Sequence, residues 1–316
     1  MTNFGYKLSS EEHSAPDLVR NARRAEEVGF DFGAISDHFH PWIDKQGESP
    51  FVWGVIGAIG QATTNLRILT GVTCPSIRVH PAIVAQASAT AASLMPGRFM
   101  LGLGSGENLN EHVLGDRWPA AGERIEMLTE AIEVIRSLWK GGNTNHRGKH
   151  YTVENARIYS LPEELPPVIV AGSGKKAIAL AGKNDGLISL APDEDLLATF
   201  DHAGGAGKPK FAEVNICWGP DETEAVTTAL EWWPVGGIGG ELMQELPLPR
   251  HFEQAASTVR PDDLTKTISC GPDPDKHAAN IKKFIEAGYD HIWIHQIGPD
   301  QSGFLDFAAK DLLPRL

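Results

Sequence analysis

Residues 30–42 of this chain read FDFGAISDHFHPW. An apolar run as long as a β-strand is followed at once by an acid, two imidazoles and an indole. In a barrel or open sheet of parallel strands, the loops at the carboxyl ends vary freely while the strands hold them still, so reactive groups collect there. The segment therefore predicts a parallel strand that leads directly into an active site.

The pattern of an apolar run followed by a turn recurs along the chain. Short apolar or β-branched runs alternate with segments of helical periodicity, as in a parallel sheet wound by crossover helices. The expected strands lie at residues 4–7, 30–36, 67–72, 99–104, 167–171, 186–189, 211–218 and 291–295. Eight such strands predict an α/β fold, a closed (β/α)8 TIM barrel. We expect one domain over residues 1–316, with insertions near residues 105–120, 141–160 and 232–267.

Periodicity also predicts what surrounds the barrel. Apolar residues at three- and four-residue spacing between Ile125 and Leu138 indicate a helix that packs its stripe on the outside of the barrel. Residues 141–160 carry turn residues and short alternating runs, which predicts a small hairpin. Residues 232–267 are rich in Gly and Pro, which favours a lid or an oligomer contact.

Composition excludes several classes of partner. With 41% apolar and 22% charged residues, no stretch approaches the roughly 20 apolar residues of a membrane span. The first residues lack the features of a secretory signal, so we expect a cytoplasmic protein. A net charge of −13 opposes binding to nucleic acid, because that affinity rests on Lys and Arg displacing counterions from phosphates. Three cysteines without short spacings favour buried free thiols.

The segment after the second strand allows more than one chemistry. Beside Asp37, His38 could be a general base that a carboxylate poises, or a hydrogen-bonded structural histidine. With His40, two residues further on, it could instead hold a metal, but no further ligands complete such a site and none is expected. Trp42 is either a pocket wall or core filling. Glu107, a carboxylate among glycines, favours a ligand or proton-transfer role.

Two glycine-rich turns follow other expected strands, GLGSGENLN at residues 102–110 and VAGSGKK at residues 170–176. Glycines let backbone amides approach a ligand closely, and the lysines that open a helix could hold a phosphate. Alone, each is more often simple turn chemistry, but in a barrel all of these turns face the same mouth. Neither fits the Rossmann fingerprint of an NAD site.

Several segments together resemble the luciferase-like barrel family, in its branch that uses the deazaflavin coenzyme F420. They are GYK at residues 5–7 with Glu11 nearby, DHFHPW at 37–42, PAIVAQ at 81–86, PGR at 96–98 and GSGENLN at 104–110. The similarity covers nearly the whole chain, and the set is far more specific than any one motif. It resembles glucose-6-phosphate dehydrogenases and secondary-alcohol dehydrogenases of this branch, and DHFHPW is closer to the latter.

The resemblance implies roles for the residues at the mouth. His38 would take the hydroxyl proton of the substrate while the carbinol hydride passes to the deazaflavin ring, and the other catalytic residues would be Trp42, Glu107 and Glu11. Cofactor contacts are implied for Asp37, Gly106, Glu107 and Asn110, and, near the phosphate-bearing tail, for Ala171, Gly172 and Ser173. A non-proline cis peptide supporting the ring would fall at Gly71–Val72. The substrate pocket would include His40, Trp232 and Met243, and relatives are commonly homodimers.

The substrate is where the chain departs from part of this branch. The sugar-phosphate members clamp phosphate with two lysines and an arginine, and the corresponding positions here are Pro192 or Asp193, Met243 and Thr267. We therefore expect an F420-dependent oxidoreductase that acts on a neutral, non-phosphorylated alcohol or its ketone. The alternatives are an F420-dependent sugar-phosphate dehydrogenase, an FMN-dependent monooxygenase of the same family, and a metal-dependent hydrolase using His38 and His40.

Overall fold

Parallel strands close into a barrel in the computed structural model, which describes residues 2–316. The barrel strands of the described chain are β1 (Asn3–Leu8), β2 (Phe32–Ile35), β3 (Arg67–Thr70), β4 (Phe99–Leu103), β7 (Val168–Ala171), β8 (Gly186–Ser189), β9 (Lys210–Cys217) and β11 (His291–Gln296). Each pairs in parallel with the next, and β9 pairs with both β8 and β11, which closes the sheet. The predicted (β/α)8 barrel is confirmed, with every strand end within two residues of its expected place.

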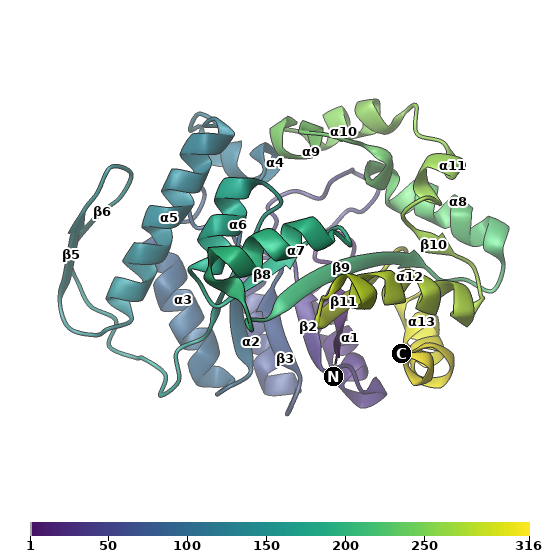
Figure 1. Cartoon of the computed structure of the whole chain (residues 1–316), viewed down its shortest axis with the longest axis horizontal. Coiled ribbons are helices and arrows are strands. Elements are labelled where there is room, and N and C mark those ends of the chain that lie inside the picture. The colour runs from purple at the N-terminus through teal and green to yellow at the C-terminus, as the bar shows by residue number, and fades with distance from the viewer. Residues whose placement is uncertain (1) are drawn as a thin grey trace.

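Helices follow the strands and cover the outside of the barrel (Figure 1). They are α1 (Ala15–Val28), α2 (Val52–Ala62), α3 (Pro81–Leu94), α5 (Ala121–Leu138), α6 (Lys175–Gly182), α7 (Glu194–Phe200), α8 (Glu222–Trp232), α12 (Pro274–Ala287) and α13 (Gln301–Phe307). In α5 the predicted stripe is confirmed, since Leu128, Ile132, Ile135 and Leu138 are all buried. Among the described residues there is no helix whose length and hydropathy would let it cross a bilayer.

Shorter elements occupy the segments expected as insertions. The hairpin of β5 (Thr144–Arg147) and β6 (Thr152–Ala156) is antiparallel, as predicted, and projects beside α5 (Figure 1). At the carboxyl ends of the strands lie α4 (Asn108–Glu111), α9 (Leu242–Glu245), α10 (Pro249–Ala256), α11 (Pro261–Leu264) and the two-residue strand β10 (Ser269–Cys270). Short 3-10 helices cover His112–Leu114, Pro234–Gly237 and Leu313–Arg315, and short π-helices cover Asp201–Gly205 and Ala308–Leu312.

The interior of the barrel changes from apolar to polar along the strands. Alternate residues of a strand point inward, and one buried inner cluster comprises Phe32, Ala34, Leu69, Met100, Ile169, Ile188, Phe211 and Trp293. Further along β9 and β11 the same inward alternation brings Glu213, Asn215 and His295 into the interior. The upper end of the barrel, where the loops gather, is therefore lined by ionisable and hydrogen-bonding groups.

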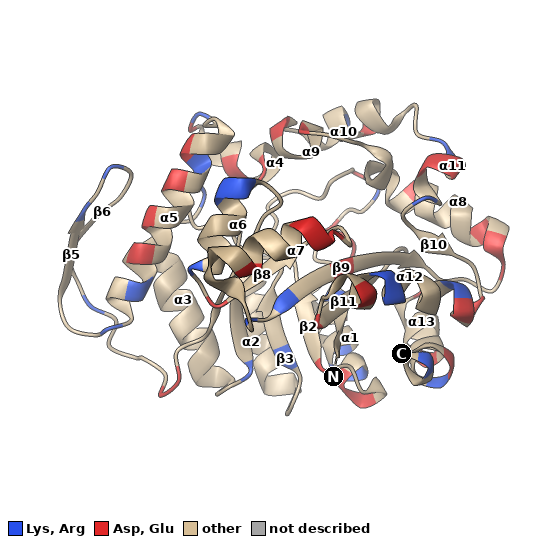
Figure 2. Ribbon diagram, in the orientation of Figure 1, with Lys and Arg blue, Asp and Glu red and all other residues tan. Residues whose placement is uncertain are grey.

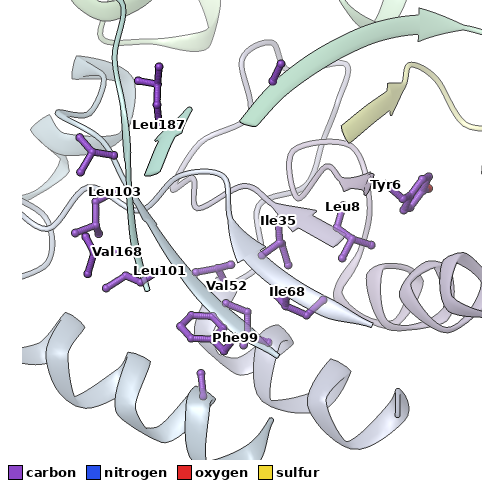
Figure 3. Packing of buried hydrophobic residues seen from close by; sticks show 14 of the residues in the cluster. Tyr6, Leu8, Ile35, Val52, Ile68, Phe99, Leu101, Leu103, Val168 and Leu187 are labelled. Atoms are coloured by element: carbon purple, nitrogen blue, oxygen red, sulfur yellow. The ribbon is translucent and has the colours of Figure 1, made fainter. Parts of the chain in front are cut away.

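A second layer of apolar side chains joins the barrel to its helices. Figure 3 shows part of this cluster, in which Leu101, Leu103 and Phe99 of β4 lie among residues from neighbouring strands and helices. Leu101 is fully buried there. Because this layer surrounds the barrel, it holds the strand ends, and hence the loops above them, at fixed positions.

Truncation of Leu101 tests how much this layer contributes to the free energy of unfolding. Leu101→Ala should lower the free energy of unfolding by about 2 to 5 kcal/mol, because it removes a packed side chain and leaves a cavity. Leu190→Ala is the matched control, since Leu190 is 69% exposed, and it should change stability by less than about 0.5 kcal/mol. Urea unfolding followed by circular dichroism measures both, and equal effects would contradict the packing described here.

Candidate active site

His38 lies in the loop that follows β2, with both ring nitrogens engaged. Its Nδ1 lies 3.1 Å from the carbonyl oxygen of His40 and donates to it, because a carbonyl can only accept. This contact leaves Nε2 as the nitrogen that can exchange a proton. Nε2 lies 3.3 Å from Oε1 of Glu11, in the loop after β1.

The carboxylate of Glu11 is buried and held in its ionised form. Burial by itself raises the pKa of Glu11, but His38, Lys7 and the hydroxyl of Ser36 together lower it to about 2. Its Oε2 also accepts a hydrogen bond of 3.2 Å from Ser9 Oγ. Glu11 is therefore a fixed negative charge beside Nε2 of His38.

Asp37 is not the partner of His38, so that sequence-based expectation is wrong. Its Oδ2 accepts from Thr73 Oγ1 at 2.8 Å and its Oδ1 from Arg78 Nη2 at 2.8 Å. Asp37 thus binds the segment after β3, while the imidazole of His38 faces Glu11 in the loop after β1.

Trp42 packs against His38 and also belongs to an apolar cluster. The centroids of the His38 and Trp42 rings lie 4.9 Å apart, edge to face, and Phe252 of α10 lies 5.2 Å from Trp42 on another side. Trp42 and Leu109 belong to the same buried cluster, against which Trp232 and Met243 also pack. The structure thus places Trp42, predicted as catalytic, in one cluster with Trp232 and Met243, which were predicted for the substrate pocket.

The turn after β4 carries Glu107 close to the same mouth. Gly106 has φ of +78°, and a Cβ there would lie 2.6 Å from the sulfur of Cys74, so only glycine fits. Glu107 precedes α4 and is half-buried, and its Oε2 has a long hydrogen bond of 3.5 Å from Asn110 Nδ2. This weak contact leaves the carboxylate of Glu107 able to bind another group.

Asn110 ties the turn after β4 to the loop after β2. Its Oδ1 accepts the backbone N–H groups of Phe39, at 2.9 Å, and of His40, at 3.3 Å. The His40 ring also contacts α4, with Nδ1 2.9 Å from the carbonyl oxygen of Leu109. The predicted cofactor residue Asn110 thus has a visible role in joining two loops.

The segment after β3 completes this side of the mouth. The Gly71–Val72 peptide bond is cis, at the position that the resemblance implies. Val72 occupies the space beside Gly104, since a Cβ on Gly104 would lie 2.6 Å from Val72 Cγ2. The chain continues by pairing with β4, where Thr73 N–H donates to Gly102 O at 2.9 Å.

The predicted site for the phosphate-bearing tail lies at the start of α6. Ala171 ends β7, the turn runs through Gly172 and Ser173, and α6 begins at Lys175. Ser173 and both lysines that open the helix are exposed. Figure 2 shows this first turn of α6 in blue. An exposed turn with basic residues suits an anionic group.

Two buried charge pairs in the barrel were missed from the sequence. Lys7 Nζ lies 3.0 Å from Glu213 Oε2, which also accepts from Trp293 Nε1 at 2.6 Å. His295 Nε2 lies 2.8 Å from Glu12 Oε2, and its Nδ1 lies 2.8 Å from Asn215 Oδ1. Polar residues at inward positions of otherwise apolar strands were the signal that could have revealed them.

A third buried cluster joins the loops after β2, β3 and β4. Arg78 donates to Asp37, and its backbone N–H donates to Oε2 of Glu111 at 2.8 Å. Arg78 Nε lies 3.5 Å from Glu111 Oε1. Burial raises the pKa of the Glu111 carboxyl to about 7, although the Arg78 backbone N–H and guanidinium favour its ionised form.

The geometry gives no support to the hydrolase alternative built on His38 and His40. Their Nδ1 atoms are taken by different carbonyl oxygens, of His40 and Leu109. Within residues 2–316 no group of three or more His, Cys, Asp or Glu side chains is arranged to hold a metal ion.

Comparison with known proteins identifies the family. Residues 1–291 match the luciferase-like monooxygenase family. The chain is a member of this family. An F420-dependent glucose-6-phosphate dehydrogenase of Amycolatopsis mediterranei is 36% identical over 330 residues, which cover 100% of this chain and 99% of the relative. The enzyme of that name from Microbacterium testaceum is 35% identical, with coverage of 99% and 97%.

Solved structures of other proteins share the same barrel. An F420-dependent secondary alcohol dehydrogenase in complex with an F420–acetone adduct superposes with a TM-score of 0.92 at 30% identity, covering 99% of this chain and 98% of the other. The coenzyme F420 dependent tetrahydromethanopterin reductase from Methanopyrus kandleri superposes with a TM-score of 0.80 at 20% identity and 99% coverage of both chains, a likeness of fold.

The raised pKa of Glu111 predicts a pH dependence of stability. Its contribution to stability is fully present below the usual value of 4.5 and is lost as the pH rises through about 7. Glu111→Gln keeps an acceptor for the Arg78 N–H but cannot ionise. Between pH 5 and pH 8, the wild type should therefore lose up to about 3 kcal/mol of unfolding free energy relative to the variant. Urea unfolding at both pH values measures this, and parallel pH profiles would contradict it.

Proposed function

We propose that this protein transfers a hydride between coenzyme F420 and the carbinol carbon of a neutral, non-phosphorylated alcohol, in either direction. The observation that carries the proposal is the buried pair of His38 and Glu11 at the mouth of the barrel, 3.3 Å apart. It supplies a base with a defined proton-accepting nitrogen. The F420-dependent oxidoreductase class rests on family members that resemble this chain over nearly its whole length.

The residues at the mouth fit a bound deazaflavin. Gly104 and Gly106 let the turn after β4 approach the segment after β3 closely, since a Cβ at either position would lie 2.6 Å from Val72 Cγ2 or from the sulfur of Cys74, and the deazaflavin ring would lie against these two segments. Ala171, Gly172 and Ser173, at the exposed start of α6, would hold the phosphate-bearing tail. When bound, coenzyme F420 supplies a two-electron acceptor for the hydride of the substrate.

His38 would accept the hydroxyl proton of the alcohol as the hydride leaves the same carbon. Its Nδ1–H is fixed by the carbonyl oxygen of His40, so the proton arrives at Nε2. Glu11, ionised and 3.3 Å away, stabilises the imidazolium that results. In the reverse direction, the same imidazolium would return the proton to the oxygen of a ketone.

The charges of the barrel interior favour this proton transfer. Lys7 and Glu213 form a buried ion pair, and Oε2 of Glu12 lies 2.8 Å from His295 Nε2. Burial lowers the pKa of the neighbouring His13, which favours its neutral form. A proton that arrives at Nε2 of His38 therefore meets the ionised carboxylate of Glu11 at 3.3 Å.

The substrate side of the mouth supports a neutral substrate. Of the positions that correspond to the phosphate clamp, Asp193 caps α7 by accepting from Leu196 N–H at 2.9 Å, and Met243 packs in the apolar cluster. Thr267 donates its hydroxyl to a carbonyl oxygen. Lys45, which lies over the Trp232 ring, has a carboxylate partner, with Nζ 3.6 Å from Glu231. These positions offer a phosphate dianion no free positive charge.

A glucose-6-phosphate dehydrogenase is the second candidate, because relatives of 35% and 36% identity carry that name. It would need another source of positive charge for the phosphate. The structure that superposes at 30% identity is instead a secondary alcohol dehydrogenase. The substrate, not the coenzyme or the barrel, is what separates these two candidates.

Replacing His38 tests the proposed base. His38→Ala should lower kcat for alcohol oxidation by about 10²- to 10⁴-fold, because no other group accepts the proton at that place, while F420 affinity stays close to that of the wild type. His146→Ala is the control, because His146 also faces a glutamate, with Nε2 3.0 Å from Glu130, but lies on the hairpin. Stopped-flow absorbance of the deazaflavin gives the rates. Wild-type turnover by the His38 variant would refute the assignment.

The substrate class can be tested with a panel of neutral secondary alcohols, ketones and glucose 6-phosphate. A neutral alcohol should give saturable F420 reduction, and glucose 6-phosphate should give a much lower kcat/KM because a dianion meets no free cation. Oxygen consumption in the presence of added FMN, measured with an oxygen electrode, tests the monooxygenase alternative. Equal or better turnover of glucose 6-phosphate would select the second candidate.

A further inference from the structure

Three loops at the mouth meet at one buried arginine. The loop after β2 carries His38 and Trp42, the segment after β3 carries Val72, and the turn after β4 carries Glu107. Each leaves a different strand, so the barrel alone does not fix their mutual positions. Arg78 belongs to the segment after β3, and its side chain, 8% exposed, reaches both of the other loops.

Arg78 contacts Asp37, which precedes His38 in the sequence, and Glu111, which follows Glu107. Nη2 donates to Oδ1 of Asp37 at 2.8 Å and to its backbone carbonyl oxygen at 3.3 Å, one residue before His38. The backbone N–H of Arg78 donates to Glu111 at 2.8 Å, and Nε lies 3.5 Å from the other oxygen of that carboxylate. Both carboxylate side chains are 1% exposed.

These contacts lead to His38 by two routes. The first is direct, through the backbone of Asp37. The second runs through α4, where Asn110 is adjacent to Glu111 and accepts the N–H of His40 at 3.3 Å. The carbonyl oxygen of His40 then accepts from His38 Nδ1 at 3.1 Å. The orientation of the imidazole therefore depends on the position of α4 as well as on its own loop.

We propose that Arg78 is a positioning residue that holds these three loops in the arrangement that binds coenzyme F420 and aims His38. The inference rests on the proposed function for the location of the coenzyme. Arg78 touches neither reactant; it acts through Asp37, Glu111 and Asn110. Without its guanidinium, the buried carboxylate of Asp37 would lose its cation and the link from Asp37 to the segment that binds Glu111 would be broken, so the loops would no longer be held together.

A lysine cannot reproduce this geometry. The guanidinium is a planar fork whose Nη2 donates to Asp37 while Nε lies 3.5 Å from Glu111, whereas an ammonium is a single point of charge. Lysine at position 78 would keep one positive charge and contact one of the two carboxylates. A lysine at position 78 therefore distinguishes a requirement for positive charge alone from a requirement for the shape of the guanidinium.

The test compares Arg78→Met and Arg78→Lys with a matched control, Arg98→Met. Arg98 is also a partly buried arginine that joins segments, because its guanidinium donates to Thr63, Leu66 and Gly60, but it precedes β4 at the opposite end of the barrel. For each full-length protein we would measure the Kd of oxidised F420 by absorbance titration. Steady-state kcat and KM with a neutral alcohol and the thermal unfolding midpoint complete the set.

Arg78→Met should raise the Kd of F420 and lower kcat by about 10- to 100-fold each, while the KM of the alcohol changes little, because the loops that hold the coenzyme and the base are displaced. Arg78→Lys should recover only part of this loss. Arg98→Met should lower the unfolding midpoint but keep the wild-type Kd.

Each other outcome counts against the proposal. If folded Arg78→Met binds F420 and turns over like the wild type, Arg78 is not a positioning residue. If Arg78→Met does not fold, a wild-type Kd and kcat for Arg78→Lys would overturn the proposal equally. An equal loss of affinity in Arg98→Met would show a general effect of stability. If the wild type itself does not bind F420, the proposed function fails and the inference with it.

Discussion

A buried carboxylate beside an imidazole, Glu11 against His38, is the interaction on which the rest of the site depends. Removing a charge from water costs several kcal/mol unless partners replace the lost hydration. For Glu11 the largest of these partners is His38, 3.3 Å away, followed by the ammonium of Lys7 and the hydroxyl of Ser36. The hydroxyl of Ser9 adds a hydrogen bond.

The barrel determines where such a carboxylate can exist. In the lower and middle parts of the interior, large apolar side chains such as Phe32 and Trp293 fill the available volume. Towards the carboxyl ends the inward positions become Glu213, Asn215 and His295, each with a polar partner. Because the polar layer lies between the apolar inner cluster and the loops, its ionisable groups are buried but still contact the loops. The chemistry is therefore restricted to one end of the molecule.

Sequence patterns predicted the elements of the fold better than the contacts of the site. Strands such as β8, and the buried stripe of α5, follow from local periodicity, which a single segment contains in full. The site needs partners from distant segments. The sequence offered the adjacent Asp37 as a possible partner of His38, but Asp37 binds Thr73 and Arg78, and the carboxylate that faces the imidazole, Glu11, comes from another strand end. Only the resemblance to a family placed Glu11 nearby, and nothing local pointed to Arg78.

The packing of Val72 against Gly104 links two segments that are far apart in the chain. A side chain at position 104 would occupy the volume that Val72 now fills, with only 2.6 Å between the atoms. The two positions consequently share one volume, and neither can grow unless the other shrinks. During divergence of this protein they should change together or not at all, so the close approach of these two segments is inherited as a unit.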